Sequence, residues 1–127
     1  MHYTGSMTSM SSDDVEASAA FYRDVLGLEV SDAEMGGIVD VQLPGGGHAI
    51  IYPKDEHEPA THTLLNFEVD DIDAAVDELI GKGVRFEHYG SDMHQDDKGV
   101  MRGRTSGMGP DQAWFLDPAG NILSILA

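Results

Sequence analysis

The chain has 127 residues, of which 7 are Lys or Arg and 23 are Asp or Glu, and its formal net charge at pH 7 is −16. This balance argues against binding to nucleic acid or to an anionic membrane, because both need positively charged protein surfaces. The absence of cysteine excludes disulfides, thiolate metal sites and cysteine nucleophiles. The length is that of one domain with a core of its own.

No part of the sequence looks like a targeting or membrane segment. Residues 1–12, MHYTGSMTSMSS, have neither the basic nor the apolar region of a signal peptide, and no stretch approaches the ~18 apolar residues of a membrane helix. We therefore expect a cytoplasmic protein with no membrane or nucleic-acid partner. The acidic surplus is typical of a solvated surface, and attraction of a cationic ligand is the alternative interpretation.

An internal repeat is the most informative feature of the sequence. Residues 13–30, DDVEASAAFYRDVLGLEV, and residues 70–86, DDIDAAVDELIGKGVRF, each open with two aspartates and an amphipathic helix. Each helix is followed by a glycine and an apolar extended stretch. Two copies of one unit indicate two similar modules, 7–53 and 62–126, joined by the polar linker 54–61 within one domain.

The first module is predicted to form a strand, a helix and three further strands. Asp13 is expected to cap the helix, with Glu16 three residues later as in a capping box, and Gly27 to end it. The apolar face of the helix, at helical spacing, comprises Val15, Ala19, Tyr22 and Leu26. Strands are expected at 7–11, 28–30, 38–43 and 48–52.

The second module repeats this order. Asp70 is expected to cap its helix and Gly83 to end it, and its apolar face comprises Ile72, Val76, Leu79 and Ile80. The strand at 63–69 places Leu64, Asn66 and Glu68 on one face and Leu65, Phe67 and Val69 on the other. Further strands are expected at 84–89, 100–104, 112–116 and 121–126, with a polar loop at 90–99 that could lie over a cleft.

Three segments together resemble the vicinal oxygen chelate superfamily, the group of glyoxalases, bleomycin-resistance proteins and extradiol dioxygenases. They are FYRDVLGL at 21–28, FEVDDIDAA at 67–75 and WFLDPAGN at 114–121. The resemblance spans nearly the whole chain. It implies an α+β fold of two βαβββ modules, each a curved mixed sheet, that enclose a cleft, usually in a homodimer. In the enzymes of the superfamily the cleft holds a divalent metal ion that the substrate chelates through neighbouring oxygens.

The resemblance also implies four strand positions at which metal-binding relatives carry ligands such as His or Glu. Here these positions hold Met7, Ile51, Leu64 and Ser124. A thioether is a poor ligand for hard or borderline ions, and alkyl groups do not coordinate metal. We therefore expect neither a family-type metal site nor a cofactor. A displaced site at His62 is the alternative.

Other candidate groups are weaker. His94 with Asp92, Asp96 and Asp97 lacks the spacing of a calcium loop and is expected to be a solvated loop. His48 is expected to face away from Ile51. Glu68 would suit proton transfer in an apolar cleft, and an exposed glutamate at a strand end is the alternative.

A cleft without metal ligands becomes an apolar cavity with a few polar groups, as small-molecule sites generally are. Trp114 would stack on a planar or cationic ligand or belong to the core. Arg102 would pair with a carboxylate or, with Arg104, alternate on an exposed edge strand. The expected lining comprises Met7, Ile51, Tyr52, Leu64, Asn66, Met101, Arg102, Trp114 and Ser124.

We therefore predict a metal-free, homodimeric protein that binds and sequesters a small, drug-like or cationic molecule, as bleomycin-resistance relatives do. The alternative is a glyoxalase-like lyase, isomerase or dioxygenase with an atypical metal site. The missing ligands and the acidic balance favour the first prediction, whereas only the resemblance in fold favours the second.

Overall fold

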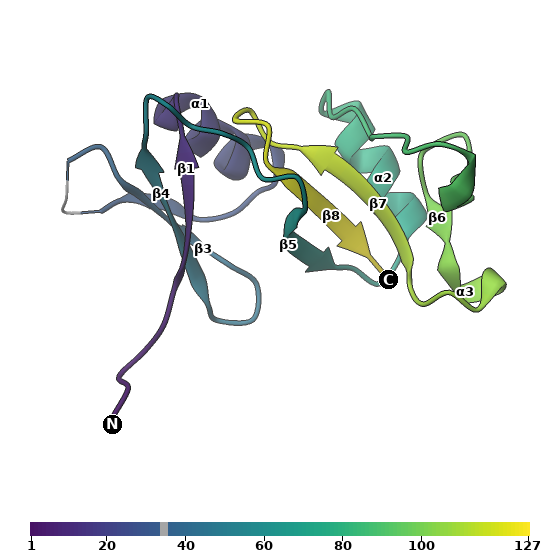
Figure 1. Ribbon diagram of the computed structural model, residues 1–127, viewed down its shortest axis with the longest axis horizontal. Helices are drawn as coiled ribbons and strands as arrows, with labels where there is room; N and C mark the ends of the chain where they lie inside the picture. The colour runs from purple at the N-terminus through teal and green to yellow at the C-terminus, as the bar shows by residue number, and fades with distance from the viewer. Residues whose placement is uncertain (34–35) are drawn as a thin grey trace. The chain divides into compact units, whose positions relative to one another are not determined.

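Each half of the chain folds as a strand, a helix and three further strands, as seen in a computed structural model that describes residues 1–33 and 36–127 (Figure 1). The two compact units are Met1–Glu58 and Pro59–Ala127. The strands of the described residues form one four-stranded mixed sheet in each unit. The predicted α+β fold of two βαβββ modules is therefore confirmed. Among the described residues, no helix has the length and apolar character needed to cross a membrane.

In the first unit the sheet has the order β1-β4-β3-β2, with β1 and β4 parallel and the other pairs antiparallel. Ala49 and Ile51 of β4 are buried on the side of the sheet that α1 covers. On the same side Met10 accepts a hydrogen bond from the buried Tyr22 hydroxyl. The elements are β1 (Thr8–Ser12), α1 (Val15–Ala20), the π-helix η1 (Phe21–Val25), β2 (Val30–Asp32), β3 (Val39–Gln42) and β4 (His48–Pro53).

The second unit repeats this topology with the order β5-β8-β7-β6, and β5 and β8 are its parallel pair. Helix α2 contacts β7 and β8, and Val76 on α2, Phe115 on β7 and Leu123 on β8 are completely buried. The elements are β5 (Thr63–Glu68), α2 (Ile72–Gly81), the 3-10 helix η2 (Ser91–Met93), β6 (Met101–Arg102), α3 (Gly103–Ser106), β7 (Asp111–Leu116) and β8 (Ile122–Leu126).

The two expected helix caps each lie one residue later than predicted. The carboxylate of Asp14, not Asp13, accepts a hydrogen bond from the backbone N–H of Ala17 at 3.1 Å. The carboxylate of Asp71, not Asp70, accepts from the N–H of Ala74 at 3.1 Å. A cap reaches the free N–H groups two or three residues ahead of it, so only the second aspartate of each pair is in range.

The glycines predicted to end the helices are in the left-handed conformation, with φ of 72° at Gly27 and 93° at Gly83. This conformation carries a steric cost for other residues. The buried face of α2 contains three of the four predicted residues. Ile72, Val76 and Leu79 are buried, but Ile80 is 45% exposed.

Two expected strands are wrong. Residues 84–89 form only an isolated bridge between Phe86 and Phe115. The Gln95 side chain accepts from the N–H of Tyr89 and donates to the carbonyl of Glu87, so these groups do not pair with a neighbouring strand. The strand expected at 100–104 has only two residues before α3 begins at Gly103. A Cβ atom at Gly103 would lie 2.3 Å from the carbonyl oxygen of Pro110, so the backbones approach there too closely for a larger residue.

The DPAGN sequence forms a turn around a buried carboxylate. Asp117 is 5% exposed and accepts from the N–H of Ala119 and of Asn121, both at 2.9 Å, and from the Asn121 side-chain amide at 3.0 Å. A buried carboxylate is stable only when hydrogen bonds replace its hydration. The turn therefore fixes where β7 ends and β8 begins.

The cap assignment predicts a difference between adjacent aspartates. Asp71→Ala should lower the free energy of unfolding by about 1 kcal/mol, because it leaves an N–H at the start of α2 without its partner. Asp70→Ala removes the same charge and should change it by less than about 0.5 kcal/mol. Urea unfolding followed by circular dichroism measures both. Equal losses in the two variants would contradict the assignment.

Candidate functional site

The side of the second sheet away from α2, termed the open face, carries a small polar cluster. Asn66 on β5 and Trp114 on β7 both lie opposite Ser124 on β8, and residues opposite each other in a sheet share a face. Gln112 lies two residues before Trp114 and therefore faces the same way. Asn66, Gln112 and Ser124 are called the amide–hydroxyl cluster below.

The members of this cluster hydrogen-bond to one another. The Gln112 side-chain N–H donates to Ser124 Oγ at 3.0 Å and to Asn66 Oδ1 at 3.2 Å, and the Ser124 hydroxyl also donates to Asn66 Oδ1. Ser124 is completely buried. Within the described part of the chain, the Asn66 amide nitrogen and the Gln112 amide oxygen have no hydrogen-bond partner. The cluster thus offers one neutral donor and one neutral acceptor.

Apolar side chains surround the cluster on the open face. Leu64 and Leu116 are 37% and 41% exposed, and Met101, which lies opposite Gln112, is buried. Trp114 is only 8% exposed, and its ring meets that of Tyr89 edge to face with 5.7 Å between centroids. Burial, with a smaller contribution from the Glu87 carboxylate, raises the pKa of Tyr89 and so keeps its phenol neutral.

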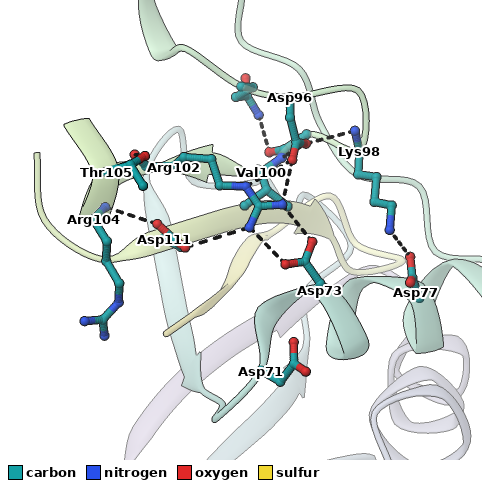
Figure 2. A network of polar contacts seen from close by, with 12 residues as sticks. Asp71, Asp73, Asp77, Asp96, Lys98, Val100, Arg102, Arg104, Thr105 and Asp111 are labelled. Carbon is teal, nitrogen blue, oxygen red and sulfur yellow. Dashed lines mark hydrogen bonds and ion pairs between the residues drawn. The ribbon is translucent and has the colours of Figure 1, made fainter.

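Arg102 does not share this face. It lies opposite Asp111, one residue along from Met101, so its side chain points to the side that α2 covers. There its guanidinium donates to both carboxylate oxygens of Asp73 on α2, at 2.7 and 3.0 Å, and to Asp96, at 2.8 and 3.2 Å (Figure 2). Arg102 thus lies on the edge strand β6, but its guanidinium is already paired with these two carboxylates and lies 3.8 Å from a third, that of Asp111 on β7.

These contacts alter the ionisation of both carboxyl groups. The hydrogen bonds from Arg102, followed by its charge, lower the pKa of Asp73 despite an opposing effect of burial. Burial raises the pKa of Asp96, but the N–H groups of Val100 and Lys98 and the Arg102 guanidinium together lower it below its usual range. The two carboxylates in turn raise the pKa of Arg102, so all three groups are charged at neutral pH.

In the first unit the expected site residues lie on different sides of the sheet. Ile51 is opposite Met10 and Val39, faces α1 and is 1% exposed. Tyr52, the next residue of β4, has its side chain on the opposite side. Met7 precedes β1 and is 56% exposed.

The counterpart of Ser124 in the first unit is Ile50 and not Ile51. Aligning the caps Asp14 and Asp71 places Ser9 with Asn66, and Ser9 lies opposite Ile50 as Asn66 lies opposite Ser124. A shift of one residue moves a side chain to the other face of a strand. Ile50, like Ile51, has no side-chain atom that coordinates a metal ion.

One hydrogen-bonded pair on the side of the first sheet away from α1 was not expected from the sequence. Asp40 lies opposite Ile50, and its carboxylate is 2.7 Å from Nδ1 of His48. Gln42 donates to the other oxygen of Asp40 at 3.3 Å. His48 faces away from Ile51, as predicted.

The other candidate residues are not hydrogen-bonded members of the amide–hydroxyl cluster. His62 is exposed just before β5, and Asp96 is bound to Arg102. Glu68 is exposed at the end of β5 and shares the open face, because it lies opposite Leu126, as Gln112 does. In the residues that the structure describes, no group of three or more His, Cys, Asp or Glu side chains is arranged to hold a metal ion. Of the predicted lining, Leu64, Asn66, Met101, Trp114 and Ser124 thus share one face of the second sheet.

The comparisons agree with the resemblance. A model of the Glyoxalase/Bleomycin resistance protein/Dioxygenase superfamily matches residues 2–125. The chain belongs to this superfamily. It matches no curated protein sequence.

Solved structures within the superfamily's fold have different described roles. TnmS3, an antibiotic binding protein from Streptomyces sp. CB03234, has a TM-score of 0.67 and 20% identity, and the match covers 98% of both chains. A lactoylglutathione lyase from Agrobacterium tumefaciens has a TM-score of 0.67 and 23% identity, with 98% of this chain and 93% of that chain covered. The oxidase ChaP-H2 has a TM-score of 0.67 and 26% identity, with 98% of this chain and 94% of that chain covered. At these identities the likeness establishes the fold, which serves both binding and catalysis.

The Arg102 contacts predict a dependence of stability on acid. Because Asp73 and Asp96 have lowered pKa values in the folded chain, their stabilising effect is complete above the pKa of an unfolded aspartate. It is lost as the pH falls through the lowered pKa values. Thermal unfolding between pH 7 and pH 2 should therefore show a shallower acid-induced fall in Tm for Arg102→Gln than for the wild type. The same profile in both proteins would contradict the assigned cause.

Proposed function

We propose that this chain is a metal-free binding protein for a small, largely apolar molecule that carries a neutral hydrogen-bonding group. The supporting observation is the amide–hydroxyl cluster on the open face of the second sheet. It includes Ser124, one of the positions at which metal-binding relatives are expected to carry a ligand. A serine hydroxyl that is buried and donates to Asn66 is a poor ligand for a divalent ion.

The free groups of the cluster define what would bind there. The Asn66 amide nitrogen donates and the Gln112 amide oxygen accepts, so a carboxamide, a lactam or a neighbouring hydroxyl and carbonyl would complement both. Each such hydrogen bond contributes about 0.5–1.5 kcal/mol. Leu64 and Leu116 provide exposed apolar surface beside the cluster, and its burial contributes about 25 cal/mol per Å².

The charge of the chain favours neutral or cationic ligands over anionic ones. The net charge of −16 repels anions and attracts cations over distances set by the ionic strength. Arg102, the arginine expected to bind a carboxylate, is paired with Asp73 and Asp96. A homodimer and a cytoplasmic location remain predictions from the resemblance and the sequence.

The alternative is a glyoxalase-like lyase, isomerase or dioxygenase with an atypical metal site. The observation that favours it is the contact between Asp40 and His48 in the first unit. An imidazole that donates Nδ1–H to a carboxylate presents Nε2 as a base or as a metal ligand. A single histidine is nevertheless fewer than the three protein ligands usual in catalytic zinc sites.

Ligand binding tests the proposal. The test is a thermal-shift screen with neutral aromatic amides, aromatic cations and aromatic carboxylates. The amides and the cations should raise Tm, since a ligand that binds the native state stabilises it, and the carboxylates should not. Asn66→Ala should weaken the best ligand about 3- to 10-fold by calorimetry, because one hydrogen bond is lost. Gln42→Ala is the matched amide control on the first sheet. An equal loss in Gln42→Ala, or no shift with any class, would refute this site.

Metal content separates the proposal from the alternative. The purified protein, dialysed against metal-free buffer, should contain well under one equivalent of zinc, nickel, manganese or iron by plasma mass spectrometry. Stoichiometric metal that survives dialysis in the wild type and disappears in His48→Ala would reject the metal-free proposal and support the enzyme.

A further inference from the structure

The aromatic ring of Tyr89 packs edge to face against the indole of Trp114. Trp114 is 8% exposed, whereas Tyr89 is 45% exposed and meets it at an interplanar angle of 69°. An aromatic ligand that stacks on Trp114 must therefore take the place of the Tyr89 ring. Access to the indole depends on the backbone segment that carries Tyr89, residues 87–100, which is called the strap below.

A single side chain within the strap ties its two ends together. Gln95 accepts from the N–H of Tyr89 at 2.7 Å and donates to the carbonyl oxygens of Glu87 at 2.9 Å and Gly99 at 2.7 Å. The N–H of Glu87 donates to the carbonyl oxygen of Trp114 at 2.8 Å, which anchors the start of the strap to β7. The position of Tyr89 is thus linked directly to the position of Gln95.

The residue after Gln95 connects the strap to α2 through Arg102. The Asp96 carboxylate accepts from the N–H of Lys98 at 3.0 Å and of Val100 at 2.9 Å, and also binds the guanidinium of Arg102. Arg102 donates at the same time to both oxygens of Asp73 on α2 (Figure 2). A continuous series of contacts therefore runs from α2 through Arg102, Asp96 and Gln95 to Tyr89.

The contacts that close this series are accessible to solvent. The side chains of Arg102, Asp73 and Asp96 are 33%, 52% and 34% exposed. Ion pairs between such exposed side chains are individually weak and are weakened further by salt. Lys98 makes a second contact with α2, to Asp77 at 2.6 Å, and is also exposed. Weak, exposed contacts at one end of a segment are typical of parts of a protein that open locally without global unfolding.

We propose that the strap is a gate over Trp114 and that Arg102 holds this gate closed. Arg102 acts as a positioning residue on the far side of the sheet, because its guanidinium contacts α2 and the strap rather than the open face. The gate extends the proposed binding function: an aromatic ring of the ligand replaces Tyr89 against Trp114 when the strap moves.

Ligand-free measurements test the gate, because Trp114 is the only tryptophan in the chain. Arg102→Gln should increase acrylamide quenching of its fluorescence at least about twofold and accelerate hydrogen exchange at the N–H of Tyr89 by about tenfold or more. Arg102→Lys, which keeps the charge but loses the two-pronged geometry, should be intermediate. Arg104→Gln is the matched control, since Arg104 binds the carbonyl of Ala127 and not the strap.

Either of two results with Arg102→Gln would overturn the gate. One is quenching and exchange in Arg102→Gln that equal those of Arg104→Gln. The other is equal acceleration at the N–H of Leu123 in β8, which would mean global destabilisation rather than local opening. If Arg102→Gln does not fold, the same measurements on the wild type with 0.5 M added NaCl, and on Gln95→Ala, replace it. No change in either would also overturn the proposal.

The ligand experiment distinguishes failure of the gate from failure of the binding function. With an aromatic amide that binds the wild type, stopped-flow fluorescence should give a severalfold higher association rate for Arg102→Gln and an unchanged rate for Arg104→Gln. An unchanged rate in Arg102→Gln overturns the gate but leaves the binding function. If no aromatic compound binds the wild type, the proposed binding function is overturned, and so is the exchange of a ligand ring for Tyr89. Opening of the strap without ligand is still tested by the quenching and hydrogen-exchange measurements.

Discussion

Strand alternation is the constraint on which the candidate site depends. Successive side chains of a strand point to opposite faces, and the hydrogen-bonded register decides which of them meet. In the second sheet this register brings Asn66 and Trp114 together around Ser124, and it sends Arg102 to the opposite side from its neighbour Met101. Two adjacent residues thus serve different purposes, since Met101 lines the open face and Arg102 fastens the strap to α2.

The same constraint explains which features the sequence predicts well. Local signals such as the spacing of apolar residues on α2, the glycines after the helices and the DPAGN turn depend on neighbours in the chain, and they were located correctly to within a residue or two. Features that depend on register between distant segments were less accurate. The choice between Ile50 and Ile51 needs the pairing of β1 with β4, and the position of Arg102 needs the pairing of β6 with β7.

The missed members of the site show where a signal was available. Gln112 lies two residues before Trp114 on one predicted strand, and residues two apart on a strand share a face. This spacing was enough to place Gln112 on the same face as Trp114. Tyr89 had no comparable signal. Its position follows from hydrogen bonds between Gln95 and the backbone, and a side chain that replaces a strand partner leaves no periodic pattern in the sequence.

The charge balance gives the Arg102 contacts their significance. Asp73 and Asp96 hydrogen-bond to the same guanidinium, and the Asp111 carboxylate lies 3.8 Å from it. Without Arg102, three carboxylates would face one another in a chain with 7 basic and 23 acidic residues. Repulsion between them would separate α2 from the strap. In a chain with so few cations, a single arginine between two elements is therefore both a source of cohesion and a point of control.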